Sequence, residues 1–213
     1  MREKVVLLGA GSHARVVLDI LRAAGAAVEV MGLLDAYPEQ EGKLEAVEGH
    51  AVLRALPEGA TAAIPAVGEN ALRQALAEKA RSAGLRLLGA VHPSAVISEK
   101  AVLGAGVVIC PGAIVVTGAV LEDGVIVNTG ATVDHDCRLG AFCHVAPGAH
   151  LAGRVTVGER AWVGIGASVR QGVRIGAGAV VGAGAAVVED VPDGVTVVGV
   201  PARPATRSPA ARG

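Results

Sequence analysis

Residues 125–158 read VIVNTGATVDHDCRLGAFCHVAPGAHLAGRVTVG, and within them an aliphatic side chain recurs at every sixth position. These aliphatic residues are Val127, Val133, Leu139, Val145, Leu151 and Val157. The period continues without interruption from residue 95 to residue 190, and Ala, Val or Cys always stands two residues before the aliphatic one. Neither an α-helix, which repeats at 3.6 residues, nor an ordinary strand, which repeats at 2.0, can sustain this pattern. A fixed six-residue repeat is typical of a β-helix solenoid.

The repeat also predicts the shape of the solenoid. Sixteen hexads at three per turn give five coils and a third, and each coil contains 18 residues. Coils stack at about 4.8 Å, the spacing of strands in a sheet. The aliphatic residues point inward, and the frequent glycines supply the positive φ that tight corners require. Residues 18 apart therefore stack on one another, whereas residues nine apart lie on opposite sides of a coil.

The first 90 residues show a different pattern, in which apolar runs alternate with amphipathic segments. We expect strands at residues 5–8, 28–34, 62–67 and 85–91. A first helix ends at Gly25 and has on one face Val16, Val17, Ile20 and Leu21. A second helix spans residues 71–83. Strands that alternate with helices predict a small parallel sheet.

The chain is therefore predicted to have a mixed fold with three parts. Residues 1–90 form a small α/β, Rossmann-like domain, and residues 91–190 form the parallel β-helix. Residues 191–213 form a C-terminal extension whose end we expect to be disordered.

Composition excludes several classes of function. Lys and Arg total 19 and Asp and Glu total 20 in 213 residues, so no strong field points to nucleic acid or to an anionic membrane. Apolar residues make up 52% of the chain, yet no run reaches the length of about 20 that a membrane helix needs. The amino terminus shows no signal peptide and the three cysteines give no disulfide framework, so we expect a cytoplasmic protein.

The segment GAGSHA at residues 9–14 fits the pattern G-x-G-x-x-A between an expected strand and an expected helix. In that context the backbone N–H groups of the turn and of the helix terminus face a phosphate. Asp35 ends the second strand, where an acid often binds a ribose hydroxyl. We therefore expect a nucleotide-binding site, with His13 beside an attached sugar, formed by Gly9, Gly11, Ser12, His13 and Asp35. A tight turn without a ligand is the alternative.

The segment 128–137 concentrates an amide, two carboxylates and an imidazole on one turn of the solenoid. His135 is the candidate general base, because a neighbouring aspartate can accept its Nδ1 proton and keep the imidazole basic near neutral pH. A surface histidine between two acids is the alternative. His144 follows nine residues later, on the other side of the coil, so one chain cannot bring the two histidines together. They meet only if solenoids pack side by side, as three prisms around a threefold axis do.

These motifs together resemble the left-handed β-helix acyltransferases of the sialic-acid O-acetyltransferase type, which include the nucleotide-sugar N-acetyltransferases of bacterial glycan pathways. The resemblance rests on VVLLGAGSHARVVLDIL at 5–21, GLLD at 32–35, AVGEN at 66–70, HPSAVIS at 92–98, the segment 125–158 and VGVPARP at 198–204. It implies a left-handed β-helix, acetyl-CoA as co-substrate, a nucleotide-sugar acceptor and a homotrimer with active sites between subunits.

The resemblance also implies roles for individual residues. The histidine of the D-H-D-C segment, His135, is the general base, and Asp136 polarises it, although family members often carry Glu there. Asn70 and Asn128 belong to the acceptor site. The resemblance places His144 near the acetyl-CoA thioester or the acceptor, and acetyl-CoA along His144, Gly153, Gly164, Ile165, Gly182 and Pro201.

The activity we predict is direct transfer of an acetyl group from acetyl-CoA to an amino or hydroxyl group of a nucleotide-linked sugar. His135 removes the acceptor proton and a backbone N–H stabilises the oxyanion, without a metal and without a covalent acyl-enzyme. A zinc lyase of the γ-carbonic-anhydrase type is an alternative, since His135, His144 and His150 offer ligands across an interface. A sialic-acid-type sugar O-acetyltransferase is another.

Overall fold

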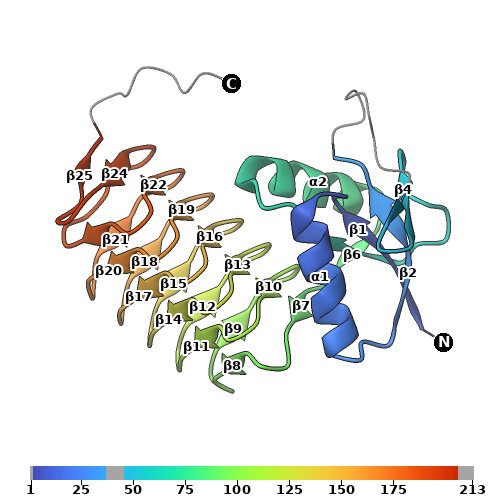
Figure 1. The fold of residues 1–213 in the computed structure, drawn as a ribbon, viewed down its shortest axis with the longest axis horizontal. Helices are drawn as coiled ribbons and strands as arrows, with labels where there is room; N and C mark the ends of the chain where they lie inside the picture. The colour runs from blue at the N-terminus through green and yellow to red at the C-terminus, as the bar shows by residue number, and fades with distance from the viewer. Residues whose placement is uncertain (1, 37–45, 206–213) are drawn as a thin grey trace.

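The computed structural model describes residues 2–36 and 46–205, in which an N-terminal α/β domain lies beside a long β-helix (Figure 1). The described elements of the first domain are β1 (Glu3–Leu8), α1 (Ser12–Ala23), β2 (Val28–Leu34), β3 (Ala46–Val47), β4 (His50–Leu53), β5 (Ala62–Pro65), α2 (Asn70–Ser82) and β6 (Arg86–Leu87). The sheet order is β3-β4-β2-β1-β5-β6, and every neighbouring pair is parallel except β3 and β4. The prediction of a small parallel sheet is confirmed.

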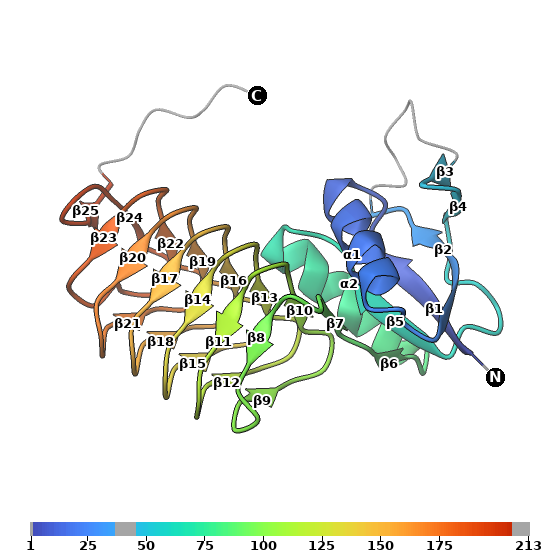
Figure 2. The ribbon, with the colours of Figure 1, turned by 60° about the horizontal axis from the view of Figure 1, so that its bottom comes forward.

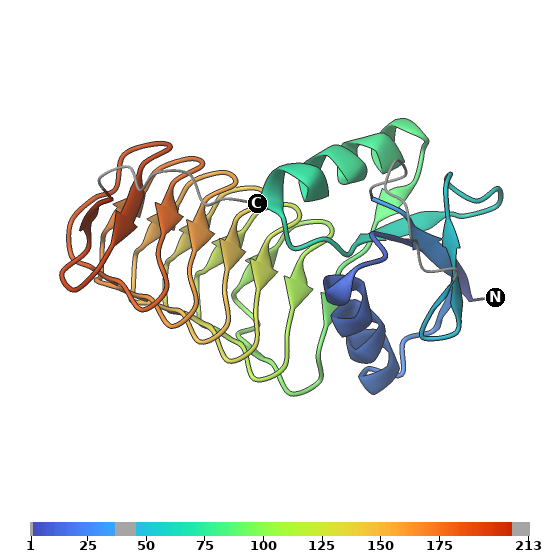
Figure 3. The same ribbon diagram turned by 45° about the horizontal axis from the view of Figure 1, so that its top comes forward.

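The two helices cover opposite faces of this sheet (Figure 3). Val5 and Leu7 of β1 belong to the core cluster that contains α1, whereas Val6 and Leu8 belong to the cluster that contains α2. This alternation follows from the two-residue period of a strand.

The buried face of α1 differs in part from the predicted one. The buried residues are Ala14, Val17, Leu18 and Ile20, and Val16 is 36% exposed. The run VVLDIL places aliphatic residues at three consecutive positions, so helical spacing alone does not decide which of them faces the sheet.

The β-helix is a triangular prism with three faces, each a parallel sheet of short strands (Figure 2). The first face contains β7 (Ala90–Val91), β10 (Val108–Ile109), β13 (Ile126–Val127), β16 (His144–Val145), β19 (Trp162–Val163), β22 (Val180–Val181), β24 (Thr196–Val198) and the antiparallel β25 (Arg203–Pro204). The second face contains β8 (Val96–Ile97), β11 (Ile114–Val115), β14 (Thr132–Val133), β17 (His150–Leu151), β20 (Ser168–Val169) and β23 (Ala186–Val187). The third face contains β9 (Val102–Leu103), β12 (Val120–Leu121), β15 (Arg138–Leu139), β18 (Thr156–Val157) and β21 (Arg174–Ile175).

The register of these strands confirms the predicted 18-residue coil. Val108 pairs with Ile126, and Thr132 pairs with His150, so each strand lies beside the strand one coil later. The aliphatic residue of each complete coil points inward, as Val127 and Val145 do, and is buried. The small residue two positions earlier, such as Ala131, is buried in the same core. The interior of the triangular coil is narrow, so this position accommodates only a small side chain. The solenoid is of the left-handed β-helix type.

Two local differences concern the ends of the solenoid. The single strand expected at 85–91 is two short strands, and the second of them, β7, pairs with β10 in the first face of the β-helix. At the other end β24 pairs with β22 at a spacing of 16 residues, because Val180 lies beside Thr196. The expected disorder at the end of the C-terminal extension concerns residues 206–213, which lie outside the described residues.

The N-terminal domain packs on the first face of the β-helix. Val108 and Ile126, whose side chains point outward from that face, share a core cluster with α1 and the strands of the α/β sheet. Phe142, at the corner where the third face turns into the first, packs in the cluster that contains α2. The shared core holds the carboxyl edge of the sheet near the solenoid.

Neither described helix has the length and apolar character needed to cross a membrane.

Candidate active site

The GAGSHA segment forms the expected turn between β1 and α1. Gly9 has φ +131°, and a side chain there would overlap with Val67 and with the carbonyl of Ala66, so only glycine fits. Gly11 is the N-cap of α1; the structure shows no side-chain cap at this helix end, and its first turn contains no acidic residue. The N–H of Ala14 donates to the carbonyl of Gly11, which leaves the N–H groups of Ser12 and His13 available to an anion such as a phosphate.

Asp35 directly follows β2, the neighbour of β1, and so lies at the same edge of the sheet as Gly9. Its backbone N–H donates to the carbonyl of Leu53 over 2.7 Å. Ser12 begins α1 and is exposed at the same edge. These positions agree with the arrangement that a nucleotide needs across a parallel sheet.

Asn70, the candidate for a base or ribose contact, lies at the start of α2. It is 8% exposed, and its Nδ2 donates to the carbonyls of Arg160 and Ala161 over 2.9 and 3.1 Å. Its Oδ1 accepts from Arg73 over 2.9 Å. The amide is thus committed to the junction between the two domains, because α2 brings it against a corner of the β-helix 90 residues away in sequence.

His144 lies beneath the N-terminal domain, on β16 of the first face, and is 3% exposed. Its Nδ1 donates to the carbonyl of Gly68 over 3.2 Å, and Asn128 donates from Nδ2 to its Nε2 over 3.0 Å. Its ring lies 4.3 Å from that of Trp162 and 6.4 Å from that of His13, centroid to centroid. The structure therefore places His144 on the same side of the solenoid as the GAGSHA turn.

Burial keeps both of these histidines neutral. Desolvation, reinforced by the positive charge of Arg73, lowers the pKa of His144 to about 3 and that of His13 to about 4. The Nε2 atom of His13 is buried and has no hydrogen-bond partner among the described residues. An orphaned polar atom beside a phosphate-type turn is typical of a site that a ligand completes.

His135 lies in the corner between β14 and β15, where the second face turns into the third. Its Nδ1 is 2.9 Å from Oδ2 of Asp136, and its side chain is 41% exposed. Asp136 has φ +58°, a left-handed conformation that Asp tolerates better than most residues. The side chain of Asp134 accepts from the backbone N–H of His135 over 2.6 Å. The pair has the geometry of a base held by a carboxylate.

The three histidines of the zinc-lyase alternative, which were proposed to meet across an interface, lie apart within one chain. His135 is at the corner opposite the first face, on which His144 lies, while His150 is on β17 of the second face and bonds to Thr132 over 3.0 Å. No group of three or more His, Cys, Asp or Glu side chains in the described ranges is arranged to hold a metal ion. The half-coil separation of His135 and His144 is confirmed.

Comparisons with known proteins agree with both halves of this arrangement. Residues 4–80 match the model of the PglD N-terminal domain, and residues 154–188 match that of the bacterial transferase hexapeptide (six repeats). The acetyltransferase domain of PglB from Neisseria gonorrhoeae, solved with acetyl coenzyme A, is 41% identical with a TM-score of 0.87, over 96% of this chain and 100% of that chain. The chain belongs to the PglD-like sugar acetyltransferases.

Two further members of this family have the same fold. PerB from Caulobacter crescentus, solved with CoA and GDP-perosamine, is 46% identical with a TM-score of 0.86, over 95% of this chain and 97% of that chain. WeeI from Acinetobacter baumannii is 27% identical with a TM-score of 0.85, over 96% and 100%. A search among curated proteins gives no match. The protein is thus an acetyl-CoA-dependent sugar acetyltransferase, and nothing in these comparisons supports the zinc-lyase alternative.

The residues expected to bind acetyl-CoA in this acetyltransferase lie along two different edges of the prism. Gly153 is in the corner between the second and third faces, directly beside His135. Gly164, Ile165 and Gly182 are in the corner between the first and second faces, and Ile165 is 55% exposed there. Pro201 follows β24 at the end of the solenoid. Within one chain, Gly153 therefore lies apart from Gly164, Ile165, Gly182 and Pro201.

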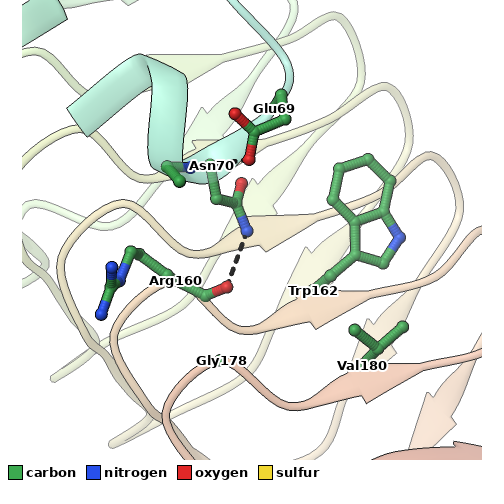
Figure 4. A pocket seen from close by; sticks show the side chains of 7 residues that line it. Glu69, Asn70, Arg160, Trp162, Gly178 and Val180 are labelled. Carbon is green, nitrogen blue, oxygen red and sulfur yellow. Dashed lines mark hydrogen bonds between the residues drawn. The ribbon is translucent and has the colours of Figure 1, made fainter. Parts of the chain in front are cut away.

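The sequence did not single out two side chains of the site region, Trp162 and Arg73. Trp162 packs on His144 and also lines a pocket of about 510 Å³ between the first turn of α2 and the β-helix (Figure 4). The other lining residues are Glu69, Asn70, Ala71, Arg160, Gly178 and Val180. Arg73 is 1% exposed and has a signal in the sequence, because it shares a helical stripe with the buried Leu76, Ala77 and Ala80.

The cysteines are structural. Cys137 follows Asp136 in the chain, yet its side chain points into the core and Sγ donates to the carbonyl of Ala152 over 3.2 Å. Desolvation raises the pKa of Cys137 to about 11 and that of Cys143 to about 12. Neither thiol is a nucleophile at neutral pH.

Proposed function

We propose that this enzyme transfers the acetyl group of acetyl-CoA to an amino or hydroxyl group of a nucleotide-linked sugar, with His135 as the general base. The observation that supports it best is the His135–Asp136 pair in a half-exposed corner of the β-helix, with Gly153 against the imidazole. The uncapped end of α1 behind the GAGSHA turn supplies a phosphate site on the same chain. PerB, at 46% identity, was solved with CoA and GDP-perosamine.

We infer that the active site forms between two subunits of a homotrimer. In one chain His135 and Gly153 lie on one edge of the second face, whereas Asn128, Gly164 and Gly182 lie on its other edge. When three prisms pack around a threefold axis, the edge of one subunit that carries His135 lies beside the edge of its neighbour that carries Asn128. The acceptor held by one subunit then meets His135 of the next, and acetyl-CoA lies in the groove between them.

The reaction follows from these positions. The acceptor nitrogen or oxygen attacks the thioester carbonyl, and His135 accepts the proton of the nucleophile as the new bond forms. Asp136 holds Nδ1, so that Nε2 is the atom that receives this proton. The carbon–sulfur bond then breaks, and the CoA thiolate leaves and takes up a proton.

The N–H of Gly153 is the proposed donor to the oxyanion. Within the described residues no group accepts from this N–H, whereas the neighbouring N–H groups of Ala152 and Arg154 donate to Val169 and His135. A free backbone N–H beside the general base is in the position at which negative charge develops during acyl transfer. The remaining site residues then bind and orient the two substrates.

The test is release of the CoA thiol from acetyl-CoA in the presence of amino and hydroxy sugars linked to UDP, GDP, CMP or dTDP. Thermal shift ranks the acceptors first, since a ligand that binds the folded state raises Tm. Mass spectrometry of the product distinguishes N- from O-acetylation. We expect His135→Ala to lower kcat at least about 100-fold. A loss of less than about tenfold shows that the assignment of the base is wrong.

A further inference from the structure

Arg73, in the first turns of α2, is fully buried and has a partner for every N–H group. Nε donates to the carbonyl of Gly124 over 2.9 Å. Nη1 donates to the carbonyls of Val67 and Gly68 over 3.1 and 2.9 Å. Nη2 donates to Oδ1 of Asn70 and to the carbonyls of Phe142 and Cys143, over 2.9, 2.7 and 3.3 Å. The planar guanidinium fixes all these acceptors in one geometry.

These acceptors come from both domains. Gly124 lies at the start of the coil that carries His135 in its second corner, and Phe142 and Cys143 lie at its end, where the next coil begins. Val67 and Gly68 belong to the loop between β5 and α2 of the N-terminal domain. One side chain therefore binds the catalytic coil and the α/β domain at the same time.

The loop that Arg73 holds is in direct contact with the phosphate-type turn. A side chain at Gly9 would overlap with Val67 and with the carbonyl of Ala66, so the turn and the loop pack at backbone distance. The N–H of Ala66 donates to the carbonyl of Leu8 over 3.0 Å. The carbonyl of Gly68 also accepts from Nδ1 of His144. A displacement of this loop would therefore move the GAGSHA turn relative to the β-helix.

A contribution to the stability of the fold does not by itself explain why an arginine is buried at this position. Desolvation lowers the pKa of Arg73 to about 10, so the group stays charged, and in the described part of the chain no carboxylate forms an ion pair with it. The charge of Glu69 raises this pKa by less than burial lowers it. Burying a charge without an ion pair costs free energy, which an apolar side chain would avoid. Arg81 offers a contrast, because it lies on the same helix and forms an exposed ion pair with Asp123 of the β-helix.

We propose that Arg73 is a positioning residue, which fixes the acceptor-binding turn at residues 9–13 relative to the catalytic coil. This inference rests on the proposed function, in which the N-terminal domain presents the acceptor. Because the threefold assembly orients neighbouring β-helices, a domain fixed on its own β-helix is also fixed relative to the His135 that it serves. Misplacement by about 1 Å is enough to lower the rate about 100-fold.

The experiment is Arg73→Lys in the full-length enzyme, with Arg81→Lys as the matched control on the same helix. Lys keeps the charge but has three donors on one nitrogen, so it cannot hold acceptors from both domains in the planar arrangement. We expect kcat per CoA-binding site to fall at least tenfold, while the KM for acetyl-CoA and the Kd for the nucleoside diphosphate stay within threefold. Arg81→Lys should stay within twofold in all three quantities.

Normalising kcat to the stoichiometry of CoA binding removes the effect of unfolded protein, which a purely structural role would produce. If Arg73→Lys does not fold, Asn70→Ala removes one acceptor of the guanidinium and should lower kcat three- to tenfold with the same pattern. A normal kcat per site in the folded variant overturns the proposal.

Hydrogen exchange gives a readout that does not depend on the acceptor. In Arg73→Lys the amides of residues 9–13 and 66–68 should exchange faster, while those of β13 and β16 keep their protection. Unchanged exchange at 66–68 contradicts the positioning role even if no sugar substrate is found. Absence of transfer in the native enzyme, with faster exchange in the variant, contradicts the proposed function alone.

Discussion

The imidazole of His135 lies directly over Gly153, one coil further along the β-helix, and a Cβ atom at residue 153 would overlap with Nε2 and Cε1 of the ring. The two residues are 18 apart, so the register of the coil stacks them. The φ of Gly153 is outside the left-handed region, so space for the ring, and not the backbone conformation, requires glycine here.

Gly153→Ala should lower kcat about 10- to 100-fold, because the added methyl group displaces the base and narrows the approach to the Gly153 N–H. The Kd for CoA, measured by calorimetry, should change less than the rate. Gly84→Ala is the control, since this glycine has φ +82°, follows the C-terminal end of α2 and has no atom within 4 Å of an added Cβ. That control should cost about 1 kcal/mol of stability with little change in kcat. Equal losses of kcat in both variants would contradict a specific role for Gly153.

Asp136→Asn should lower kcat/KM about 10- to 100-fold, because the amide no longer accepts the Nδ1 proton as a carboxylate does. The substitution keeps the backbone intact, since Asn tolerates the φ of +58° as well as Asp does. Asp134→Asn is the matched control: its Oδ1 still accepts from the N–H of His135, and we expect a change below about threefold. Steady-state kinetics on both variants tests the assignment, and comparable losses would refute it.

Acid should destabilise the protein through His13 and His144. Their pKa values in the folded state, about 4 and about 3, lie below the ordinary 6.5, so the unfolded chain binds protons first as the pH falls. The two histidines do not lower the free energy of unfolding above pH 6.5. Between about pH 6.5 and pH 4 they lower it by up to about 1.4 kcal/mol per pH unit for each histidine.

Urea unfolding at several pH values measures this dependence. His144→Gln should reduce the slope of the free energy of unfolding against pH by the contribution of one proton. His150→Gln, at an exposed histidine, is the control for the substitution itself. A slope in His144→Gln that equals the native one would show that His144 titrates normally in the folded state.

An active site between subunits predicts complementation. His135→Ala and His13→Ala should each have little activity, since the first lacks the base and the second lacks a residue of the acceptor site. Co-expressed at equal amounts, they form mixed trimers in which about one quarter of the sites combine two intact halves. Thiol release should recover to about that fraction of the native rate. No recovery in mixed trimers, confirmed by mass spectrometry, would place the whole site within one chain.

The parts of the fold that the sequence predicted are those in which each residue meets neighbours at a fixed sequence distance. The buried positions of Val127, Val145 and their equivalents follow from the hexad alone. The turn at Gly9 also follows from local sequence, because a strand, a glycine with positive φ and a helix stand in immediate succession.

The contacts that the sequence did not predict join residues that are distant in the chain. Asn70 was expected at a ribose or base, and its amide bonds to carbonyls 90 and 91 residues away. His144 was expected near the thioester or the acceptor, and its Nδ1 bonds to Gly68, 76 residues away. Because these acceptors are backbone carbonyls, which every residue carries, no side-chain pattern reveals them.

The sequence by itself determined the β-helix, its 18-residue register and the separation of His135 from His144, since a strict period fixes which residues stack and which lie on opposite sides. Only the tertiary structure decided that the N-terminal domain packs on the first face, with Arg73 binding both domains and His144 buried beneath the acceptor turn. That packing depends on shape and on backbone acceptors brought together by the fold, and these have no periodic signature in the chain.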